Sequence, residues 1–341
     1  MIKPEIQERY SRQILFAGIG EKGQQRLLES HVAIVGCGAT GSAIASLLAR
    51  AGVGQLRIID RDYVEPSNLQ RQNLFDESDA IESAPKAIAA TRKITAFNSA
   101  ISIEPVVNDL RPENIEELLA HAHLILDGTD NFETRYLIND WSVKNSIPWI
   151  YTAAVGAYAA TMNIVPRATA CLTCIFPQTP TGLVETCETA GILNSAVNFA
   201  ASVAATEAIK ILAGVTAELR RSLLSYDLWR NERAEVNAGH PRKDCQTCGV
   251  HEFPHLAGKG RAHITLCGRN SVQIHEHARH IDLAEVGRRL SPLGRVRHND
   301  FLLKFNADPY EMTLFPDGRA IIKGTTDTAL ARSLYARYVG S

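Results

Sequence analysis

A glycine-rich loop directly after a short apolar run constrains the fold of this chain more than any other feature. The run Val32–Val35 is followed by Gly36-Cys37-Gly38-Ala39-Thr40-Gly41. This pattern is typical of a strand that turns into a helix, with small residues where backbone N–H groups can approach a phosphate or ribose. A tight turn with no ligand is the simpler alternative. We take the loop as a nucleotide-binding candidate, through Gly36, Gly38, Ala39 and Gly41.

Apolar runs alternate with amphipathic segments from residue 32 to about 165, which predicts βαβ units. The expected fold class is α/β: a Rossmann-like, doubly wound, mainly parallel sheet. Strands are predicted at Val32–Gly36, Leu56–Asp60, Ile101–Val107, His123–Asp127 and Trp149–Ala153, with additional strands at Ala157–Val165 and Ser222–Asp227. Helices are predicted at Thr40–Ala51, from near Pro85 to Phe97, and at about 112–121, 131–145 and 190–213.

The character of the chain changes after Cys248, so we predict one domain over residues 1–254 and a second over 255–341. The second is expected to be a small α+β domain with several short strands and helices at about 282–290 and 326–339. Phe315-Pro316-Asp317-Gly318-Arg319 predicts a hairpin turn, because Gly318 can take a positive φ. The sequence does not indicate what this domain does.

Four of the seven cysteines form two CxxC pairs, Cys171 with Cys174 and Cys245 with Cys248. Four thiolates in two such pairs suit tetrahedral Zn²⁺ and leave no open position for chemistry. A dithiol redox centre needs only one pair, and plain buried cysteines are the remaining alternative. We therefore predict a structural zinc knot, and we expect Cys37 and Cys267 to be packing residues.

Overall composition excludes some classes of partner. Hydrophobic residues make up 45% of the chain, charged residues 21%, and the formal net charge is −1. Bulk electrostatics therefore favour neither nucleic acid nor an anionic membrane. The polar start Met1–Glu5 and the lack of a long uninterrupted apolar stretch predict a cytoplasmic protein that does not span a membrane.

The segment after the second predicted strand favours a triphosphate over a dinucleotide. Asp60 ends that strand about 20 residues beyond the glycine loop, where a carboxylate can accept ribose hydroxyl hydrogens. Arg71 and, from the next helix, Lys86 can neutralise phosphate charge, whereas a nicotinamide would need neutral surroundings. Taken alone, however, this segment is more typical of a solvated loop with a surface arginine.

Six motifs, in this order along the chain, resemble the ThiF/MoeB family, the bacterial relatives of ubiquitin-activating enzymes. The resemblance covers roughly residues 6–250. It rests on Arg9–Gln13, the glycine loop, Ser67–Gln72, Pro85-Lys86, Asp127–Asn131 and the two CxxC pairs.

The resemblance implies ATP-dependent adenylylation of the C-terminal glycine carboxylate of a ubiquitin-like sulfur-carrier protein, with release of pyrophosphate. The favoured carrier is of ThiS type (thiamine thiazole route), and a MoaD-type carrier (molybdopterin route) is the alternative. A sulfur-donating desulfurase is a further candidate partner.

The same resemblance implies roles for individual residues. Asp60 would hold the ribose, Asp130 would organise Mg²⁺, and Arg12 would reach the ATP site of a partner subunit in a homodimer. The residues expected to contact the phosphates are Asn68, Arg71 and Lys86, and the further nucleotide-site candidates are Asp62, Ser67, Gln72 and Asn131.

Cys187 precedes the long helix predicted at 190–213. A thiol near a helix N-terminus can have a lowered pKa, but the flanking Glu185 and Glu188 disfavour the thiolate. By resemblance it matches a cysteine that links covalently to the sulfur carrier in some ThiF members, so a catalytic and a passive role both remain open. The histidines of Ile274–His280 have no ordered ligand spacing, and we interpret them as a solvated polar segment rather than a metal site.

Two other functional classes are weighed against this one. An NAD-dependent Rossmann oxidoreductase would need a set of hydride-transfer residues, and none is evident in the sequence. A non-catalytic carrier-binding scaffold would be expected to have lost Arg71, Lys86 or Asp130, and all three are present.

Overall fold

The computed structural model describes residues 4–178, 190–258, 265–266, 270–274 and 281–340. The chain divides into two compact units, Met1–Gly260 and Arg261–Ser341. The division falls shortly after the domain boundary at 254/255 predicted from the sequence.

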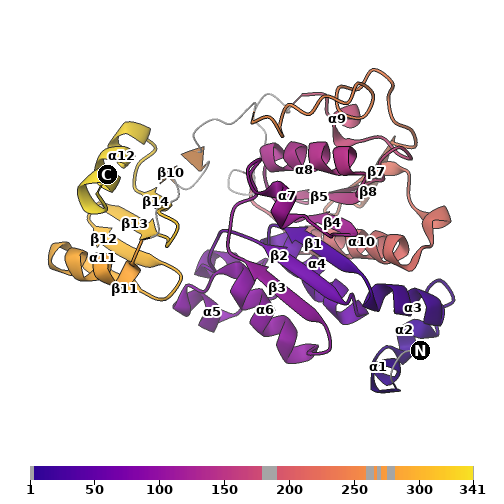
Figure 1. Cartoon of the computed structure of the whole chain (residues 1–341), viewed down its shortest axis with the longest axis horizontal. Helices are drawn as coiled ribbons and strands as arrows, with labels where there is room; N and C mark the ends of the chain where they lie inside the picture. The colour runs from indigo at the N-terminus through magenta and orange to yellow at the C-terminus, as the bar shows by residue number, and fades with distance from the viewer. Residues whose placement is uncertain (1–3, 179–189, 259–264, 267–269, 275–280, 341) are drawn as a thin grey trace. The chain divides into compact units, whose positions relative to one another are not determined.

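The first unit is built on an eight-stranded sheet with the order β3-β2-β1-β4-β5-β6-β7-β8 (Figure 1). The five strands from β3 to β5 are parallel, and β6, β7 and β8 continue the sheet as antiparallel neighbours. This confirms the predicted doubly wound, mainly parallel sheet, although β8 is not among the predicted strands. The strands are β1 (His31–Val35), β2 (Gln55–Ile59), β3 (Ser102–Val106), β4 (Leu124–Asp127), β5 (Trp149–Val155), β6 (Tyr158–Ile164), β7 (Ser222–Asp227) and β8 (Glu232–Asn237).

The predicted helices are present, with two shifts in their ends. The helix predicted at about 112–121 forms only over Ile115–Leu118, and the one predicted at 190–213 begins at Asn194 because Leu193 is still extended. The N-terminal helices and the short helix α5 are not predicted from the sequence. The helices are α1 (Pro4–Arg9), α2 (Ser11–Ile14), α3 (Gly20–Leu28), α4 (Ala39–Ala51), α5 (Glu77–Glu82), α6 (Lys86–Phe97), α7 (Ile115–Leu118), α8 (Phe132–Asn145), α9 (Leu172–Ile175) and α10 (Asn194–Ala213), with short 3₁₀ turns at Pro66–Asn68 and Thr216–Glu218.

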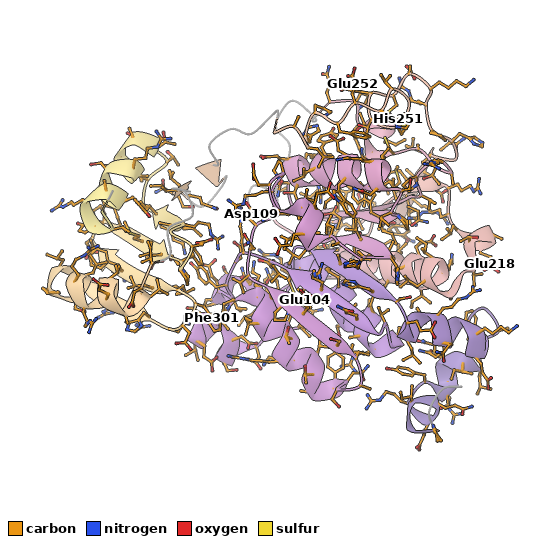
Figure 2. The ribbon with its side chains drawn as sticks, in the orientation of Figure 1. Glu104, Asp109, Glu218, His251, Glu252 and Phe301 are labelled. Atoms are coloured by element: carbon orange, nitrogen blue, oxygen red, sulfur yellow. The ribbon has the colours of Figure 1, made fainter. Side chains whose placement is uncertain are left out.

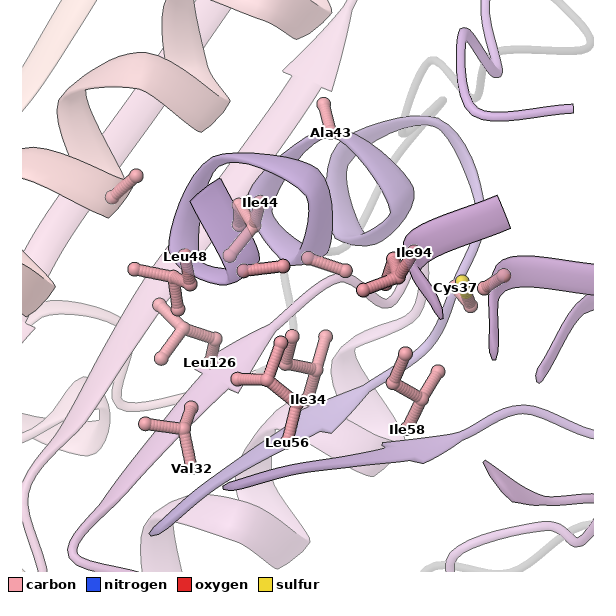
Figure 3. Close-up of a cluster of buried hydrophobic side chains, with 14 of the residues drawn as sticks. Val32, Ile34, Cys37, Ala43, Ile44, Leu48, Leu56, Ile58, Ile94 and Leu126 are labelled. Atoms are coloured by element: carbon pink, nitrogen blue, oxygen red, sulfur yellow. The ribbon is translucent and has the colours of Figure 1, made fainter. Parts of the chain in front are cut away.

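Both faces of the central strands of the first sheet are buried, which is why these strands are almost wholly apolar. In β1, Val32 and Ile34 pack toward α4, as Figure 3 shows, while Ala33 and Val35 belong to the cluster on the other face. Helices α4, α6 and α10 contribute to the first cluster, and α7 and α8 to the second. The alternation fixes which face of the sheet each side chain points to, and the parallel direction of the strands brings the loops that follow β1, β2 and β4 to one edge.

Helix α10 is the predicted long apolar helix. Its length and composition would also suit a membrane span. Its contacts indicate a different role, because α10 packs on α3, α4, β5 and β6. Its buried residues include the alanines Ala200, Ala201, Ala204 and Ala208, whose small side chains permit close helix packing. These contacts are those of a core helix in the first unit.

The second unit is a six-stranded antiparallel sheet with the order β11-β12-β13-β14-β10-β9 and two helices, as predicted for a small α+β domain. The predicted turn is confirmed, because Phe315 N donates to Arg319 O at 2.9 Å and Gly318 has φ 84°. The elements are β9 (Thr265–Leu266), β10 (Ser271–Ile274), α11 (Leu283–Leu290), a 3₁₀ turn (Ser291–Leu293), β11 (Arg295–His298), β12 (Leu303–Ala307), β13 (Tyr310–Leu314), β14 (Ala320–Lys323) and α12 (Thr328–Tyr338).

Candidate nucleotide site and cysteine cluster

The glycine loop joins β1 to α4 at the carboxyl edge of the parallel strands. Gly36 has φ 84°, and a Cβ on Gly41 would lie 1.9 Å from Gly36 O. A Cβ on Gly128, after β4, would lie 2.4 Å from the same oxygen. Backbone packing therefore requires glycine at these positions whether or not a ligand binds.

Gly38 differs from the other two loop glycines. The nearest atom to a Cβ built there is Gln72 Nε2 at 4.0 Å, so no backbone crowds the position. Ala39 is the first residue of α4. The backbone N–H groups at the N-terminus of this helix point toward the space beside Gly38. Close packing thus does not explain Gly38, which leaves the approach of a ligand as a reason for glycine there.

Asp60 follows β2 and holds the adjoining backbone. Its carboxylate accepts hydrogen bonds from Cys37 N at 2.5 Å and Asp62 N at 2.6 Å. Burial raises the pKa of Asp60, and the charge of Lys86 opposes that shift. Cys37 is fully buried, and burial raises the pKa of its thiol above the ordinary value, which agrees with its predicted packing role.

Lys86 and Asp62 come together although 24 residues separate them. The backbone of residues 62–64 pairs with that of 84–86, through Lys86 N to Asp62 O at 2.8 Å and Val64 N to Ala84 O at 2.8 Å. Lys86 is 5% exposed, and its Nζ lies 3.2 Å from Asp62 Oδ2. The structure therefore places a buried cation beside the carboxyl ends of β1 and β2.

Asn68 and Gln72 carry buried polar atoms that lack a hydrogen-bond partner in the described part of the chain. These atoms are Asn68 Nδ2 and Gln72 Oε1, while Asn68 Oδ1 accepts from Glu65 N at 3.1 Å. A buried polar group without a partner is costly, so such atoms point to a missing ligand or water. Ser67 is exposed and Arg71 half-buried, with Arg71 Nη1 donating to Ser67 O at 3.0 Å. The polar side chains of this segment are therefore suited to bind a nucleotide.

A buried ion pair after β4 is a part of this edge that sequence reasoning missed. Arg135 Nε donates to Asp127 Oδ2 at 2.9 Å, and Arg135 Nη2 donates to the carbonyl oxygens of Thr129 and Thr152 at 2.6 and 3.0 Å. Asp127 also accepts from Thr129 N at 2.8 Å. Together these bonds fix the 128–131 loop. The sequence signal would have been an arginine eight residues after a strand-end aspartate, one helical turn into α8.

Asp130 and Asn131 lie in that loop, and both are exposed. Asn131 caps α8, because its Oδ1 accepts from Thr134 N at 2.9 Å. Burial alone would lower the pKa of Arg61. The net shift is upward, because nearby carboxylates favour the charged guanidinium: those of Asp109, Asp62, Asp60 and Asp130. The Asp109 partner, labelled in Figure 2, lies 3.0 Å from Arg61 Nη1. Asp130 therefore faces the same edge as Asp60.

Arg12 lies at the opposite end of α4 from the glycine loop. It is exposed on α2, and α2 is held there because Gln13 Nε2 donates to Ala51 O, at the end of α4, at 2.8 Å. Helix α4 has 13 residues, so its ends are about 20 Å apart at 1.5 Å per residue. The structure does not bring Arg12 to the nucleotide-site residues of its own chain.

The four paired cysteines converge although the pairs are far apart in sequence. Their Sγ atoms all lie within 4.8 Å of one another, at 3.8 Å for Cys171 with Cys174, 3.6 Å for Cys171 with Cys245 and 3.3 Å for Cys174 with Cys248. A tetrahedral Zn²⁺ with Zn–S bonds of about 2.3 Å requires S···S separations of about 3.8 Å. None of the four is in a disulfide. The geometry is therefore compatible with zinc.

Side chains of helix α8 accept hydrogen bonds from the segments that carry the two cysteine pairs. Asn139 Oδ1 accepts from Leu172 N at 2.8 Å, and the Asp140 carboxylate accepts from Thr247 Oγ1 at 3.2 Å and His255 N at 2.9 Å. Burial raises the pKa of Asp140 to about 6, and these hydrogen bonds partly offset the shift. Both cysteine pairs are thereby anchored to one helix. Cys187, Cys267 and the histidines at 275–280 lie outside the described residues.

Comparisons with known proteins agree with this geometry. The chain matches the ThiF family over residues 10–247. It is 45% identical to the sulfur carrier protein ThiS adenylyltransferase of Bacillus subtilis, across 97% of this chain and 99% of that protein. It is 36% identical to the SAMP-activating enzyme E1 of Haloferax volcanii, across 71% of this chain and 88% of that protein.

A vertebrate relative and a solved structure each match 71% of the chain. The adenylyltransferase and sulfurtransferase MOCS3 of Sus scrofa is 35% identical, across 71% of this chain and 53% of that protein. A crystal structure of Escherichia coli MccB with MccA-N7isoASN superposes with a TM-score of 0.63 at 24% identity, across 71% of this chain and 75% of that one, which supports the fold alone. From the family match and its relatives, the chain belongs to the ThiF family and is an adenylyltransferase.

Proposed function

We propose that this enzyme uses ATP to adenylylate the C-terminal glycine carboxylate of a ubiquitin-like sulfur-carrier protein of ThiS type, for thiamine thiazole synthesis. The supporting observation is the convergence at one sheet edge of an uncrowded Gly38, the buried Lys86 and the partnerless atoms of Asn68 and Gln72. ThiS is favoured as the carrier because the similarity to the Bacillus subtilis enzyme extends through the second unit.

In this reaction a carboxylate oxygen of the carrier attacks the α-phosphorus of ATP. An acyl–phosphate bond forms, the bond between the α-phosphorus and the bridging oxygen breaks, and pyrophosphate leaves with that electron pair. Two anions must approach each other, so positioning and positive charge are the main catalytic resources. Lys86 and Arg71 supply the charge, and Asn68 and Gln72 supply polar groups whose hydrogen bonds the nucleotide would complete.

The remaining site residues bind and orient the nucleotide in this proposal. Asp60 accepts hydrogen bonds from the ribose, since each carboxylate oxygen has a second lone pair beyond the bond it already accepts. Asp62 pairs with Lys86 and holds its ammonium group in place. Asp130, an exposed carboxylate, would hold Mg²⁺, which neutralises phosphate charge. Ser67 and Asn131 border the nucleotide.

We further propose a homodimer in which Arg12 serves the partner's site. Its place at the far end of α4, about 20 Å from the glycine loop, supports a role between subunits rather than within one. The four cysteines would hold one structural Zn²⁺, and the enzyme would be cytoplasmic. A catalytic or a passive role for Cys187, and a desulfurase partner, belong to a later sulfur-transfer step that adenylylation does not need.

The proposal is tested by carrier-dependent pyrophosphate exchange with purified ThiS-type and MoaD-type carriers assayed side by side. Exchange with the ThiS-type carrier and little with the MoaD-type carrier is the expected result. The reverse preference would move the enzyme to the molybdopterin route. Exchange with neither carrier would contradict the proposed substrate class.

A further inference from the structure

One face of the second-unit sheet packs against α11 and α12, and the other is polar. Directly opposed residues of an antiparallel sheet point to the same side, and neighbours along a strand alternate. In β12, Leu303 and Phe305 are in the core, so Lys304 and Asn306 lie on the other side. We define the basic face as the residues on that side in β11, β12 and β13: Arg295, Arg297, Lys304, Asn306, Glu311 and Thr313.

Cations outnumber carboxylates on this face. The single carboxylate, Glu311, has Lys323 of β14 as its partner, with Nζ 3.6 Å from Oε1. Arg295 and Arg297 are exposed on the edge strand β11, and no ion pair joins either to a carboxylate in the described part of the chain. Positive charge from Arg295 and Arg297 therefore remains next to the sheet edge.

The face is hollowed where these cations meet. A hollow of about 210 Å³ is lined by Arg295, Arg297, Lys304, Asn306 and Glu311. A water molecule takes about 30 Å³ of the liquid, so a group the size of a phosphate or a short polycarboxylate fits. The turn from β11 to β12, which carries Phe301, lies at one end of these strands (Figure 2).

A buried hydroxyl beside the hollow points independently to a ligand. Thr313 is fully buried, and its Oγ1 has no hydrogen-bond partner among the residues that the structure describes. It stands directly opposite Lys304, which lines the hollow. Ser271 Oγ and Gln273 Oε1 of β10, on the same side of the sheet, are also buried and partnerless within the described segments. Buried polar groups normally have partners, so three on one face favour a bound polar group.

We propose that the basic face binds an oxyanion, the phosphate or carboxylate group of a small molecule. Two arginines with planar guanidinium groups can form paired hydrogen bonds to either kind of anion. A single-stranded nucleic acid is disfavoured, because it stacks on aromatic side chains and this side of strands β10–β14 has none. The inference does not depend on the proposed adenylylation.

The test is calorimetric titration of the full chain with inorganic phosphate and, separately, citrate, at constant ionic strength in Tris chloride. Binding of phosphate alone would identify a phosphoryl ligand, and binding of citrate alone a carboxylate ligand. The double variant Arg295→Gln/Arg297→Gln should weaken the binding at least tenfold. Arg332→Gln, an exposed arginine on α12, is the matched control and should bind as the unaltered protein does.

Thr313→Val separates a binding role from a structural one. It should weaken anion binding severalfold while leaving the thermal unfolding temperature of the anion-free protein unchanged or higher, because it removes a buried hydroxyl without a partner. No measurable binding of either anion would overturn the proposal. So would equal binding by the arginine double variant, or loss of binding in Lys86→Met, which would place the anion in the first unit.

Discussion

Lys86 shows how one side chain acquires a function through its surroundings. A lysine is rarely buried without a partner, and here the exposed fraction is 5% with Asp62 Oδ2 at 3.2 Å. Asp62 is itself partly open to solvent, so an incoming phosphate can share the ammonium group. The same local arrangement includes Asp60, whose charge Lys86 stabilises.

We predict that Lys86→Met lowers the rate of carrier-dependent pyrophosphate exchange by roughly 100-fold or more, the usual cost of one preorganised charged donor. The methionine keeps the length of the side chain and removes its charge. Lys93→Met is the matched control on the same helix, since the partly buried Lys93 pairs with Asp76 and Asp79 and not with Asp62. Comparable rates for both variants would exclude Lys86 from the site.

The Asp127–Arg135 pair gives a second prediction for single residues. Arg135→Met should lower the free energy of unfolding by about 3–5 kcal/mol, because it leaves a buried carboxylate unpaired. It should also slow pyrophosphate exchange, since Arg135 holds the carbonyl of Thr129 beside Asp130. Urea unfolding and exchange assays measure the two effects. Arg92→Met, an exposed pair with Glu82, should change neither, and unaltered stability of Arg135→Met would contradict the argument.

Short elements near the cysteine cluster are held in position by contacts with segments that are distant in the sequence. The four-residue helix α9 carries Cys174 and depends on Asn139 of α8 and on the second cysteine pair for its position. Arg242 N donates to Cys174 Sγ at 3.4 Å, which adds a backbone hydrogen bond to the cluster. A metal at this point would join the loops after β6 and β8 to the body of the unit.

We predict about one zinc per purified chain, and a lower thermal unfolding temperature after removal by a strong chelator or in Cys171→Ser. Metal binding to the folded state adds directly to its stability. Cys37→Ser, a buried thiol outside the cluster, should retain zinc, so metal content separates the two variants even if both lose stability. Purified protein that contains no metal and is equally stable with and without chelator would be inconsistent with a zinc knot.

At the scale of the whole molecule, the N-terminal helices are fastened to the far ends of α4 and α6. Arg9 Nη1 donates to Phe97 O at 3.0 Å, and Asn98 Nδ2 donates to Tyr10 Oη at 2.9 Å. Most of the Arg9–Gln13 motif therefore anchors α1 and α2, and Arg12 remains exposed beside the apolar surface residues Leu15 and Phe16. Exposed apolar side chains next to a cation fit a contact between subunits.

We predict that Arg12→Ala and Lys86→Ala homodimers are each nearly inactive and that mixing them restores activity. In a heterodimer one site carries both lesions and the other neither, so it should retain about half the activity of the unaltered dimer, by the logic of an arginine supplied in trans. Pyrophosphate exchange after subunit exchange, checked by differential tagging, is the measurement. No recovery in confirmed heterodimers would place Arg12 outside the partner's site.

The sequence by itself determined most strands and the longer helices of the chain, together with the positions of its motifs. Strand and helix patterns depend on neighbours a few residues away, so β1, α4 and the hairpin at Gly318 could be predicted closely. The helices α1–α3 and the strand β8 could not be predicted in this way. Strand β8 is fully exposed and lacks an apolar pattern. CxxC spacing was sufficient to predict the cysteine cluster, though not its support by Asp140.

Only the tertiary structure decided which side chains meet. Lys86 reaches Asp62 through backbone pairing of two loops, Arg135 bonds both Asp127 and Thr152 because α8 packs on β5, and Thr313 stands beside Lys304 through strand register. Such contacts join residues far apart in sequence, or depend on the register of strands, and neither composition nor local periodicity carries that information. The nucleotide site at the carboxyl edge of the first sheet and the basic face of the second sheet therefore both depend on how the elements pack together. The sequence predicts many of these elements one by one, but not their packing.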